Sequence, residues 1–271
     1  QTQRLPGRIM KRFNIKSLLF VASLLLFSSV KVFSAGGEAE PLKVNWSFKG
    51  ITGKFDRASL QRGFQVYKEV CSSCHSMQYL SYRNLGESGG PEFSEQEVKA
   101  IAASVEITDG PDDQGEMFTR SGRPADKFKN PYPNVKASIA ANGGAYPPDM
   151  SVLVKARPGG SNYIYSVLVG YEDPPAGVTL DDGVYYNKYM IGNKIKMASP
   201  LSDDIVEYSD GTQASVDQMA KDVTTFLSWA AEPELEERHR TGVKVIIYLI
   251  LLTTLVYLSM KKIWSRVDTE V

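Results

Sequence analysis

The sequence predicts a mainly α-helical domain with long ordered loops, joined to one transmembrane helix near its C-terminus. Three observations support this fold class. Several amphipathic stretches follow residues that commonly cap helices, the region between Pro111 and Pro200 is rich in Gly, Pro, Asn and Tyr, and Val243–Met260 is an apolar run of 18 residues. Alternating apolar and polar residues are scarce, so we expect few strands.

The first 34 residues have the pattern of a signal peptide, which would be removed from the mature protein. The basic stretch "KRFNIK" precedes the short apolar run "SLLFVASLLLFSSV", and the small residues of "VFSAGG" suit cleavage near Ser34. Residues 1–9 form an extension upstream of this pattern. A membrane anchor is the alternative, but the run is short for a full span. We therefore expect an exported domain over residues 35–232.

Three helices are expected in this domain because each follows a capping residue. Asp56 should cap a helix that ends near Val70, and Ser94 with Glu97 forms a capping box ahead of "VKAIAASV". Ser215 precedes apolar residues at helical spacing, which predict the last helix before the anchor. The Gly- and Pro-rich region between the second and third helices is long, and a long loop in a compact domain usually needs something to pack around.

Residues 233–271 are expected to form the C-terminal anchor and a short cytoplasmic tail. Pro233 should start the helix that enters the membrane, and the apolar run has about the minimum length for a bilayer span. Lys244 lies near one end of this run and Trp264 just beyond the other, where each side chain can reach the membrane–water interface. The export signal sets the orientation, so the bulk of the chain should lie outside the cytoplasm.

Both cysteines of the chain lie in one short stretch, Cys71-Ser-Ser-Cys74-His75, hereafter the C-x-x-C-H motif. This spacing predicts covalent c-type haem attachment, in which two thioethers hold the porphyrin and the histidine binds iron. Thiol–disulfide exchange is an alternative, but that chemistry belongs at the start of a helix near a βαβ unit, which the sequence does not predict. Structural zinc usually needs four ligands, and His239 is the one remaining histidine. A plain structural disulfide is the last alternative.

A haem iron usually needs a second axial ligand unless it binds gas or reacts with peroxide. Methionine is the expected ligand, because histidine–methionine ligation raises the reduction potential as an electron carrier requires. Met219 lies on an apolar helix face and is expected in the core. Met197 is the leading candidate, since it lies in the polar loop "NKIKMASPL", and the other methionines that remain possible are Met117, Met150 and Met190.

The stretch "WSFKGITGKFDRASLQRGFQVYKEVCSSCHSMQYLSYRNL" resembles the N-terminal part of the cytochrome c1 family, bacterial type. These proteins are the haem subunits of ubiquinol–cytochrome c reductase, the cytochrome bc1 complex. The resemblance continues through "NGGAYPPDMSVLVKAR", "KMASPL" and "AKDVTTFLSWAAEPELEERHRTGVKV", over residues 41 to 265. It implies a class I cytochrome c-like domain with one haem c. It also implies roles for six residues: Cys71 and Cys74 as attachment points, His75 and Met197 as iron ligands, Arg157 near a haem propionate and Tyr163 near the haem.

The resemblance also implies a function and partners. The chain would take electrons from a Rieske iron–sulfur subunit and pass them to a soluble or membrane-anchored cytochrome c, in a dimeric complex that contains cytochrome b. It would be a single-pass protein of the bacterial inner membrane, with its haem domain on the periplasmic side. We expect no nucleic-acid partner and no independent catalytic site. The alternatives are a membrane-anchored cytochrome c of another complex, such as a terminal oxidase, and an exported thiol oxidoreductase.

The charges are unevenly distributed although the totals balance at 31 basic and 31 acidic residues. The first 34 residues hold six basic and no acidic side chains, so the remainder has an acidic excess. Part of this excess lies in "EITDGPDDQGE" and at Asp181–Asp182. Such runs commonly keep a domain soluble, but in an electron carrier they can also steer a basic partner.

Overall fold

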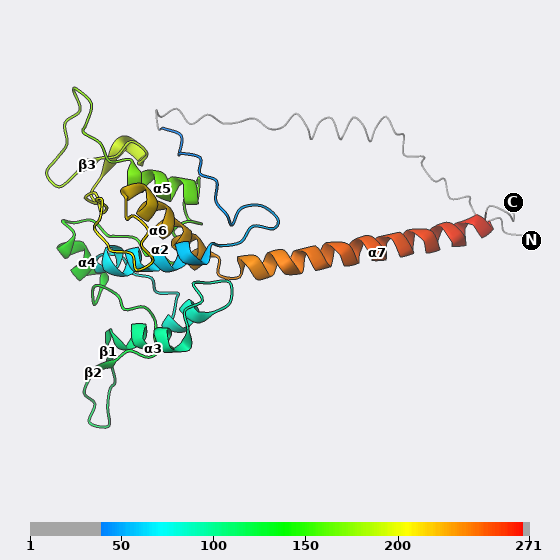
Figure 1. Ribbon diagram of the computed structural model, residues 1–271, viewed down its shortest axis with the longest axis horizontal. Helices are drawn as coiled ribbons and strands as arrows, with labels where there is room; N and C mark the ends of the chain where they lie inside the picture. The colour runs from blue at the N-terminus through cyan, green and yellow to red at the C-terminus, as the bar shows by residue number, and fades with distance from the viewer. Residues whose placement is uncertain (1–38, 268–271) are drawn as a thin grey trace, which may run out of the picture. The chain divides into compact units, whose positions relative to one another are not determined.

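The structure is a computed structural model that describes residues 39–267. The predicted signal peptide over 1–34 lies outside the described residues. The elements shown in Figure 1 are, in chain order, α2 (Arg57–Glu69), η1 (Cys71–Ser73), η2 (Tyr82–Gly86), α3 (Glu95–Ala103), β1 (Glu106–Asp109), β2 (Phe118–Ser121), α4 (Val135–Ala141), α5 (Ser161–Val169), β3 (Tyr185–Tyr186), η3 (Ile191–Asn193), β4 (Lys194–Ile195), α6 (Val216–Ala231) and α7 (Leu235–Val267).

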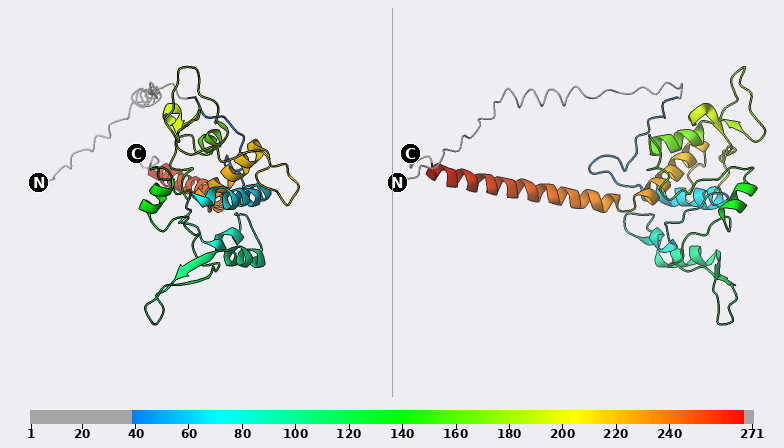
Figure 2. Two further views of the ribbon diagram at one scale, coloured as in Figure 1. Left: turned by 90° about the vertical axis from the view of Figure 1, so that its left-hand side faces the viewer. Right: turned by 180° about the vertical axis from the view of Figure 1, so that it is seen from behind.

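Helices α2 and α6 lie side by side and form the centre of the core (Figures 1 and 2). Their backbones approach closely at Gly63, where an added Cβ would lie 2.1 Å from the carbonyl oxygen of Asp222. Phe64 and Tyr67 of α2 pack on Phe226 of α6, with ring centroids 5.7 and 5.9 Å apart. Glycine at position 63 therefore allows two helices with large aromatic side chains to pack without a gap between their backbones.

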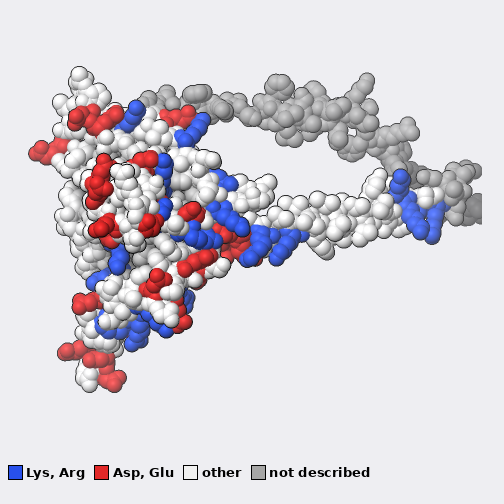
Figure 3. Space-filling view, in the orientation of Figure 1, with Lys and Arg blue, Asp and Glu red and all other residues white. Residues whose placement is uncertain are grey.

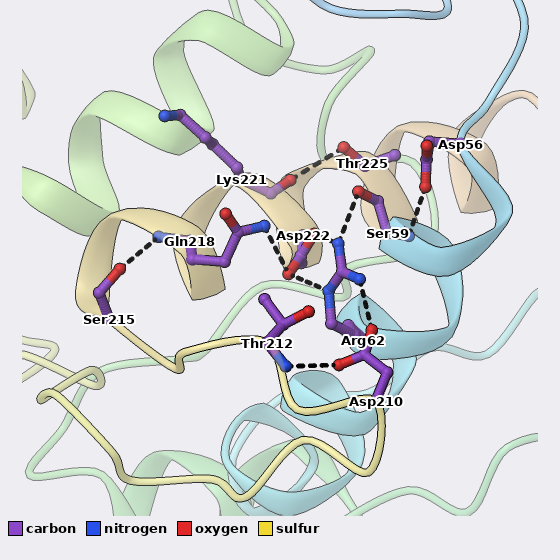
Figure 4. A network of polar contacts seen from close by, with 10 residues as sticks. All are labelled: Asp56, Ser59, Arg62, Asp210, Thr212, Ser215, Gln218, Lys221, Asp222 and Thr225. Carbon is purple, nitrogen blue, oxygen red and sulfur yellow. Dashed lines mark hydrogen bonds and ion pairs between the residues drawn. The ribbon is translucent and has the colours of Figure 1, made fainter.

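A polar network crosses the same interface (Figure 4). Asp222, which is fully buried, accepts hydrogen bonds from Arg62 at 2.8 and 3.1 Å and from Gln218 at 3.0 Å. Arg62 also donates to Asp210 at 2.7 Å. Hydrogen bonding to Asp222 raises the pKa of the Arg62 guanidinium above its usual value. The buried carboxylate is thus paired and hydrogen-bonded, which is the condition for a charge to be tolerated inside a core.

Helix α5 packs on α6, and the extended N-terminal segment lies on α5. The Ser161 and Ser228 hydroxyl oxygens lie 2.9 Å apart between α5 and α6. The N–H of Leu42 donates to Ser166 Oγ at 2.8 Å, and the indole N–H of Trp46 donates to Asn162 Oδ1 at 2.7 Å. These contacts attach the first described residues to α5.

Strand structure is limited to two antiparallel pairs among the described residues. Strand β1 pairs with β2, with Glu106 opposite Ser121, and β3 pairs with β4 over two residues each. Arg120 of β2 bonds to Asp109 of β1 at 2.5 Å and to Asp126 at 2.7 and 2.8 Å. The predicted mainly α-helical fold with long ordered loops is therefore confirmed.

The predicted helix starts are confirmed at three positions. The side chains of Asp56, Ser94 and Ser215 each accept a hydrogen bond from the backbone N–H three residues later, at 2.8, 3.3 and 3.2 Å. The expected start of the last helix at Pro233 is two residues early, because Pro233 and Glu234 form a turn. Helix α7 itself begins at Leu235, so the proline precedes the helix instead of opening it.

Helix α7 is the one helix among residues 39–267 that is long and apolar enough to cross a membrane, and its candidate span runs from Leu235 to Arg266. The side chains from Val245 to Val256 are exposed, including a nearly continuous series of Ile and Leu. A helix that is apolar on all sides and not packed against its own domain has the properties of a membrane span.

Candidate haem-binding site

Helix α2 ends directly before the C-x-x-C-H motif and fixes it against the core. Val66 and Tyr67 in the last turns of α2 are buried. In the turn η1 that follows, the N–H groups of Cys74 and His75 both donate to the carbonyl oxygen of Cys71, at 3.1 and 2.9 Å. Both cysteines are free and half-buried, and His75 is buried. The helix therefore presents two thiols and an imidazole within one tight turn.

The imidazole of His75 has a fixed orientation. Its Nδ1 lies 2.8 Å from the carbonyl oxygen of Pro148. Because a carbonyl oxygen can only accept, Nδ1 carries the proton and Nε2 has a free lone pair. Burial lowers the pKa of His75, and this effect outweighs the hydrogen bond to Pro148 and the charge of Asp149. The site therefore holds a neutral imidazole whose Nε2 can bind a metal.

Asp149 joins the segment that contains Pro148 to the segment that follows His75. Its carboxylate accepts hydrogen bonds from Ser76 Oγ at 2.7 Å and from the backbone N–H groups of Gln78 and Ser151 at 3.0 and 2.9 Å. Partial burial opposes ionisation of Asp149, but these hydrogen bonds prevail and hold its pKa below the usual value. The bonds from His75 to Pro148 and from Ser76 and Gln78 to Asp149 join two loops that are about 70 residues apart in the chain, while the bond from Ser151 is local.

Met197 lies in a bend just after β4 and is half-buried. Its carbonyl oxygen accepts a hydrogen bond from the Tyr171 hydroxyl at 3.0 Å. The neighbouring Lys196 ammonium donates to the carbonyl oxygen of Gly143 at 3.1 Å. Gly143 is five residues before Pro148, so the loop that contains Met197 and the imidazole of His75 both contact the short segment 143–148.

The other candidate methionines have different surroundings. Met117 is exposed beside the β1–β2 hairpin, and Met150 is buried with its backbone N–H bonded to the carbonyl oxygen of Ser76 at 2.8 Å. The sulfur of Met190 accepts a hydrogen bond from the Tyr163 hydroxyl at 3.3 Å. Met219 is fully buried in α6, as the sequence predicts for a core residue.

The two remaining predicted residues lie on either side of the turn that begins α5. Arg157 is exposed, and its guanidinium donates to the carbonyl oxygen of Ala156 at 3.1 Å. Tyr163 lies in the first turn of α5 and is half-buried, and its hydroxyl donates to the sulfur of Met190. The structure thus groups Tyr163 with Met190, and it groups His75 with Pro148 and Asp149.

Comparison with known proteins identifies the family of this chain. The family model described as "Cytochrome C1 family" matches residues 46–267. The chain belongs to the cytochrome c1 family. The match includes the C-x-x-C-H motif, the Pro148–Asp149 segment, the Met197 loop and α7, so every part of the site described above lies within it.

Relatives in the cytochrome c1 family come from bacteria and eukaryotes. The "Cytochrome c1" of Rhodospirillum rubrum is 45% identical over 269 residues, which cover 93% of this chain and 98% of the relative. "Cytochrome c1 2, heme protein, mitochondrial" of Arabidopsis thaliana is 48% identical over 251 residues, covering 90% and 79%. "Cytochrome b/c1" of Bradyrhizobium diazoefficiens is 47% identical over 268 residues, which cover 92% of this chain but 39% of that longer protein.

Sequence reasoning missed Pro148 and Asp149 as individual site residues of this cytochrome c1 family member. Both belong to "GGAYPPDMS", where two prolines precede an aspartate in a glycine-rich loop. Prolines restrict the backbone and remove N–H donors, so such a loop can aim a carbonyl group at a partner. That pattern is a usable sign of an ordered loop, but it does not identify the partner as His75.

Proposed function

We propose that this chain binds one covalently attached haem c and serves as the membrane-anchored electron-transfer subunit of ubiquinol–cytochrome c reductase. The observation that carries the proposal is the C-x-x-C-H turn, which presents two thiols and a neutral imidazole. The Nδ1 of this imidazole donates a hydrogen bond to the carbonyl oxygen of Pro148. Membership of the cytochrome c1 family supports it, and several mitochondrial relatives bear the words "heme protein" in their names.

The donor set suits haem c. Cys71 and Cys74 would form the two thioethers, and Nε2 of His75 and the sulfur of Met197 would bind the iron. Arg157 is proposed to approach a propionate group and Tyr163 to lie close to the porphyrin. Haem c, when bound, supplies a one-electron couple with a potential raised by the methionine thioether.

The residues of the chain then control that couple by orientation and burial. The Pro148 carbonyl oxygen holds the His75 ring in one tautomer, and Asp149 holds the Pro148 segment in place. Burial of His75 lowers its pKa and favours the neutral ring. A neutral ring with its proton held on Nδ1 would let His75 bind the iron of haem c without gaining or losing a proton.

The proposed electron donor is a Rieske iron–sulfur subunit, and the proposed acceptor is a soluble or membrane-anchored cytochrome c. Cytochrome b would be a third partner, in a dimeric complex of the bacterial inner membrane. Helix α7 would span this membrane once, with the haem domain on the periplasmic side. The length and exposure of α7 support the single span, and the predicted signal peptide supports the orientation.

The substitution Met197→Leu tests the ligand assignment. Leucine fills a similar volume but cannot bind iron, so the covalent haem should be retained while the spectrum becomes high-spin or shows a new ligand. The reduction potential should fall by on the order of 100 mV, because a thioether stabilises ferrous iron. Optical spectra and a redox titration of the purified full-length protein measure both effects.

Met190→Leu is the matched control, because it changes another half-buried methionine on a neighbouring loop. It should leave the spectrum and the potential close to those of the wild type. If Met197→Leu keeps the wild-type potential while Met190→Leu lowers it, Met190 is the ligand and the assignment of Met197 is wrong.

Two further measurements separate the competing functions. Co-purification of the chain with a cytochrome b would support membership of ubiquinol–cytochrome c reductase over a role in a terminal oxidase. A pyridine haemochrome spectrum distinguishes haem from thiol chemistry. Thiol exchange needs a thiolate, and burial and, less strongly, the neighbouring Cys74 raise the pKa of Cys71 to about 12, which disfavours exchange at Cys71.

The acidic residues of the β1–β2 hairpin tip are proposed to steer a basic cytochrome c. Asp112, Asp113 and Glu116 are exposed there, and Figure 3 shows acidic side chains gathered at the end of the hairpin. Neutralising all three should flatten the dependence of the bimolecular oxidation rate on ionic strength while leaving the haem spectrum unchanged. Equal salt slopes for the wild type and the triple variant would assign this run to solubility.

A further inference from the structure

The loop over residues 47–54 is a closed turn with a rigid base. The N–H of Lys54 donates to the carbonyl oxygen of Ser47 at 3.1 Å, and the N–H of Gly53 donates to that of Gly50 at 3.2 Å. Gly50 has a φ of 89°, which favours glycine. At the base, the buried rings of Phe48 and Phe55 pack with centroids 4.8 Å apart. The core therefore fixes the direction in which the tip of the loop points.

An isoleucine occupies the tip of this well-fixed turn. Ile51 is 76% exposed, more than any other large apolar side chain in the described residues, including those of the apolar helix α7. Moving such a side chain from water into an apolar medium is favourable. A single exposed apolar residue is ordinary, but the position of the 47–54 loop relative to α7 gives this one a specific environment.

The loop is bound to the first turns of α7, as Figures 1 and 2 show from opposite sides. The carbonyl oxygen of Gly53 accepts a hydrogen bond from His239 Nδ1 at 3.2 Å. The N–H of Phe55 donates to Glu236 Oε1 at 2.9 Å, and Arg57 donates to both oxygens of Glu236 at 2.8 and 2.9 Å. His239 is half-buried against this loop.

These contacts set the depth of the loop relative to a bilayer. His239 precedes Val243, the first residue of the apolar run, by four residues, or about 6 Å along a helix. The polar headgroup layer on each side of the hydrocarbon is about 5–7 Å thick. A loop attached at His239 and carrying Ile51 two residues away from Gly53 therefore lies at the level of the lipid headgroups.

The charges around the loop suit anionic lipid. Lys49 and Lys54 flank Ile51, and Figure 3 shows a group of basic side chains where α7 begins. The acidic side chains of the first turn of α7 are paired within the chain, Glu236 with Arg57 and Glu237 with Arg240. The side chain of Lys49 makes no ion pair with any described residue, so its charge is available to a phosphate group.

We infer that the 47–54 loop is a second membrane contact, in which Ile51 enters the boundary between headgroups and acyl chains and Lys49 and Lys54 lie beside anionic phosphates. The inference rests on the proposed role of α7 as a membrane span. A single helix leaves the domain free to tilt, whereas a laterally offset second contact restricts the tilt. The loop would thus help to hold the haem domain at a constant angle to the membrane surface.

A nitroxide at position 51 tests the inference in the full-length haem-loaded protein in lipid nanodiscs. In that protein the native cysteines are consumed by thioethers, so Ile51→Cys supplies the reactive thiol, and unmodified protein treated in parallel reports any labelling of Cys71 or Cys74. Power saturation by oxygen and by a water-soluble nickel complex then reports the depth of the label. We expect a ratio of oxygen to nickel accessibility several-fold higher than at Val178→Cys, a partly exposed loop position far from α7 in sequence and not hydrogen-bonded to it.

Leu255→Cys, on the apolar part of α7, provides the separate test of the membrane span. If the label at position 255 has high oxygen and low nickel accessibility while the label at position 51 is as accessible to nickel as a label in water, the loop inference is wrong and the span is intact. If the label at position 255 is itself as accessible to nickel as a label in water, the proposed anchor is wrong. If the Ile51 label is shielded from both reagents in the purified complex, a protein subunit covers the loop and the lipid inference is wrong.

A comparison of anionic with neutral lipid tests the role of the two lysines. Nanodiscs with anionic lipid should give a higher oxygen-to-nickel ratio at position 51 than nanodiscs of neutral lipid alone, because the lysines attract phosphate. Adding Lys49→Gln and Lys54→Gln to Ile51→Cys should remove that difference. A lipid dependence that survives both substitutions would contradict the role given to these two lysines.

Discussion

The α2–α6 pair and the segment over residues 129–200 both contact the C-x-x-C-H motif, but different interactions stabilise them. Eleven of the 16 residues of α6 are buried, most of them against α2 and α5. In the 129–200 segment, the buried large apolar side chains outside α5 are Met150 and Val154. The segment is instead held by single hydrogen bonds, such as those of Pro148 and Asp149.

The helix pair therefore contributes mainly to stability, and the loop segment contributes mainly to the geometry of the site. Apolar burial between two helices is spread over many side chains, so it contributes much free energy and depends little on any one polar atom. A few hydrogen bonds contribute less free energy, but they fix the orientation of the groups that they join. The helix pair therefore supports the motif, while the loop segment decides how His75 is oriented.

Gly63→Ala should destabilise the helix pair strongly. The added methyl group would overlap the Asp222 carbonyl group and would force the two helices apart. The free energy of unfolding should fall by about 3 kcal/mol as a result. Thermal unfolding of the full-length protein in detergent, followed by circular dichroism, measures the change. Gly242→Ala is the matched control, because this helical glycine has open space around its Cβ position and alanine favours helix by up to about 1 kcal/mol. Equal stabilities for the two variants would show that α2 and α6 do not need the close approach.

Asp149→Ala should have a smaller and more local effect. It removes the acceptor for Ser76, Gln78 and Ser151, at a cost of about 1–3 kcal/mol. Hydrogen exchange should rise in residues 143–152 and in the turn after His75, while α2 and α6 keep their protection. Asp149→Asn retains one acceptor oxygen and should lie between alanine and the wild type. Faster exchange throughout α6 would mean that the loop segment also supports the helix pair.

Acid should weaken the edge of the helix pair slightly. The backbone N–H of Thr212 and, next, the guanidinium of Arg62 lower the pKa of Asp210 to about 2. Because its folded pKa lies below the unfolded value of about 3.9, Asp210 stabilises the fold above that value, and the contribution is lost as the pH falls toward 2. The side chain is 41% exposed, so the effect should stay below about 1 kcal/mol. The stability difference between wild type and Asp210→Asn should be present at pH 6 and vanish in acid, and a difference that persists below pH 2 would refute the assignment.

Features that depend on neighbouring residues could be predicted from the sequence alone. The caps at Asp56, Ser94 and Ser215 work within three residues, and the apolar run of α7 is defined by its own length. The C-x-x-C-H motif is likewise a local pattern that a single turn brings together. Physical rules that act over one turn of a helix can be read without the fold.

Which distant loops meet depends on the fold as a whole and could not be predicted from the sequence. His75 and Pro148 are 73 residues apart, and Gly53 and His239 are 186 residues apart, with no periodic pattern in the sequence to pair them. Each contact joins a side chain to a backbone carbonyl group, which every residue possesses, so residue type does not reveal the partner. The packing of α2, α5 and α6 places these loops, and the orientation of His75 follows from that packing.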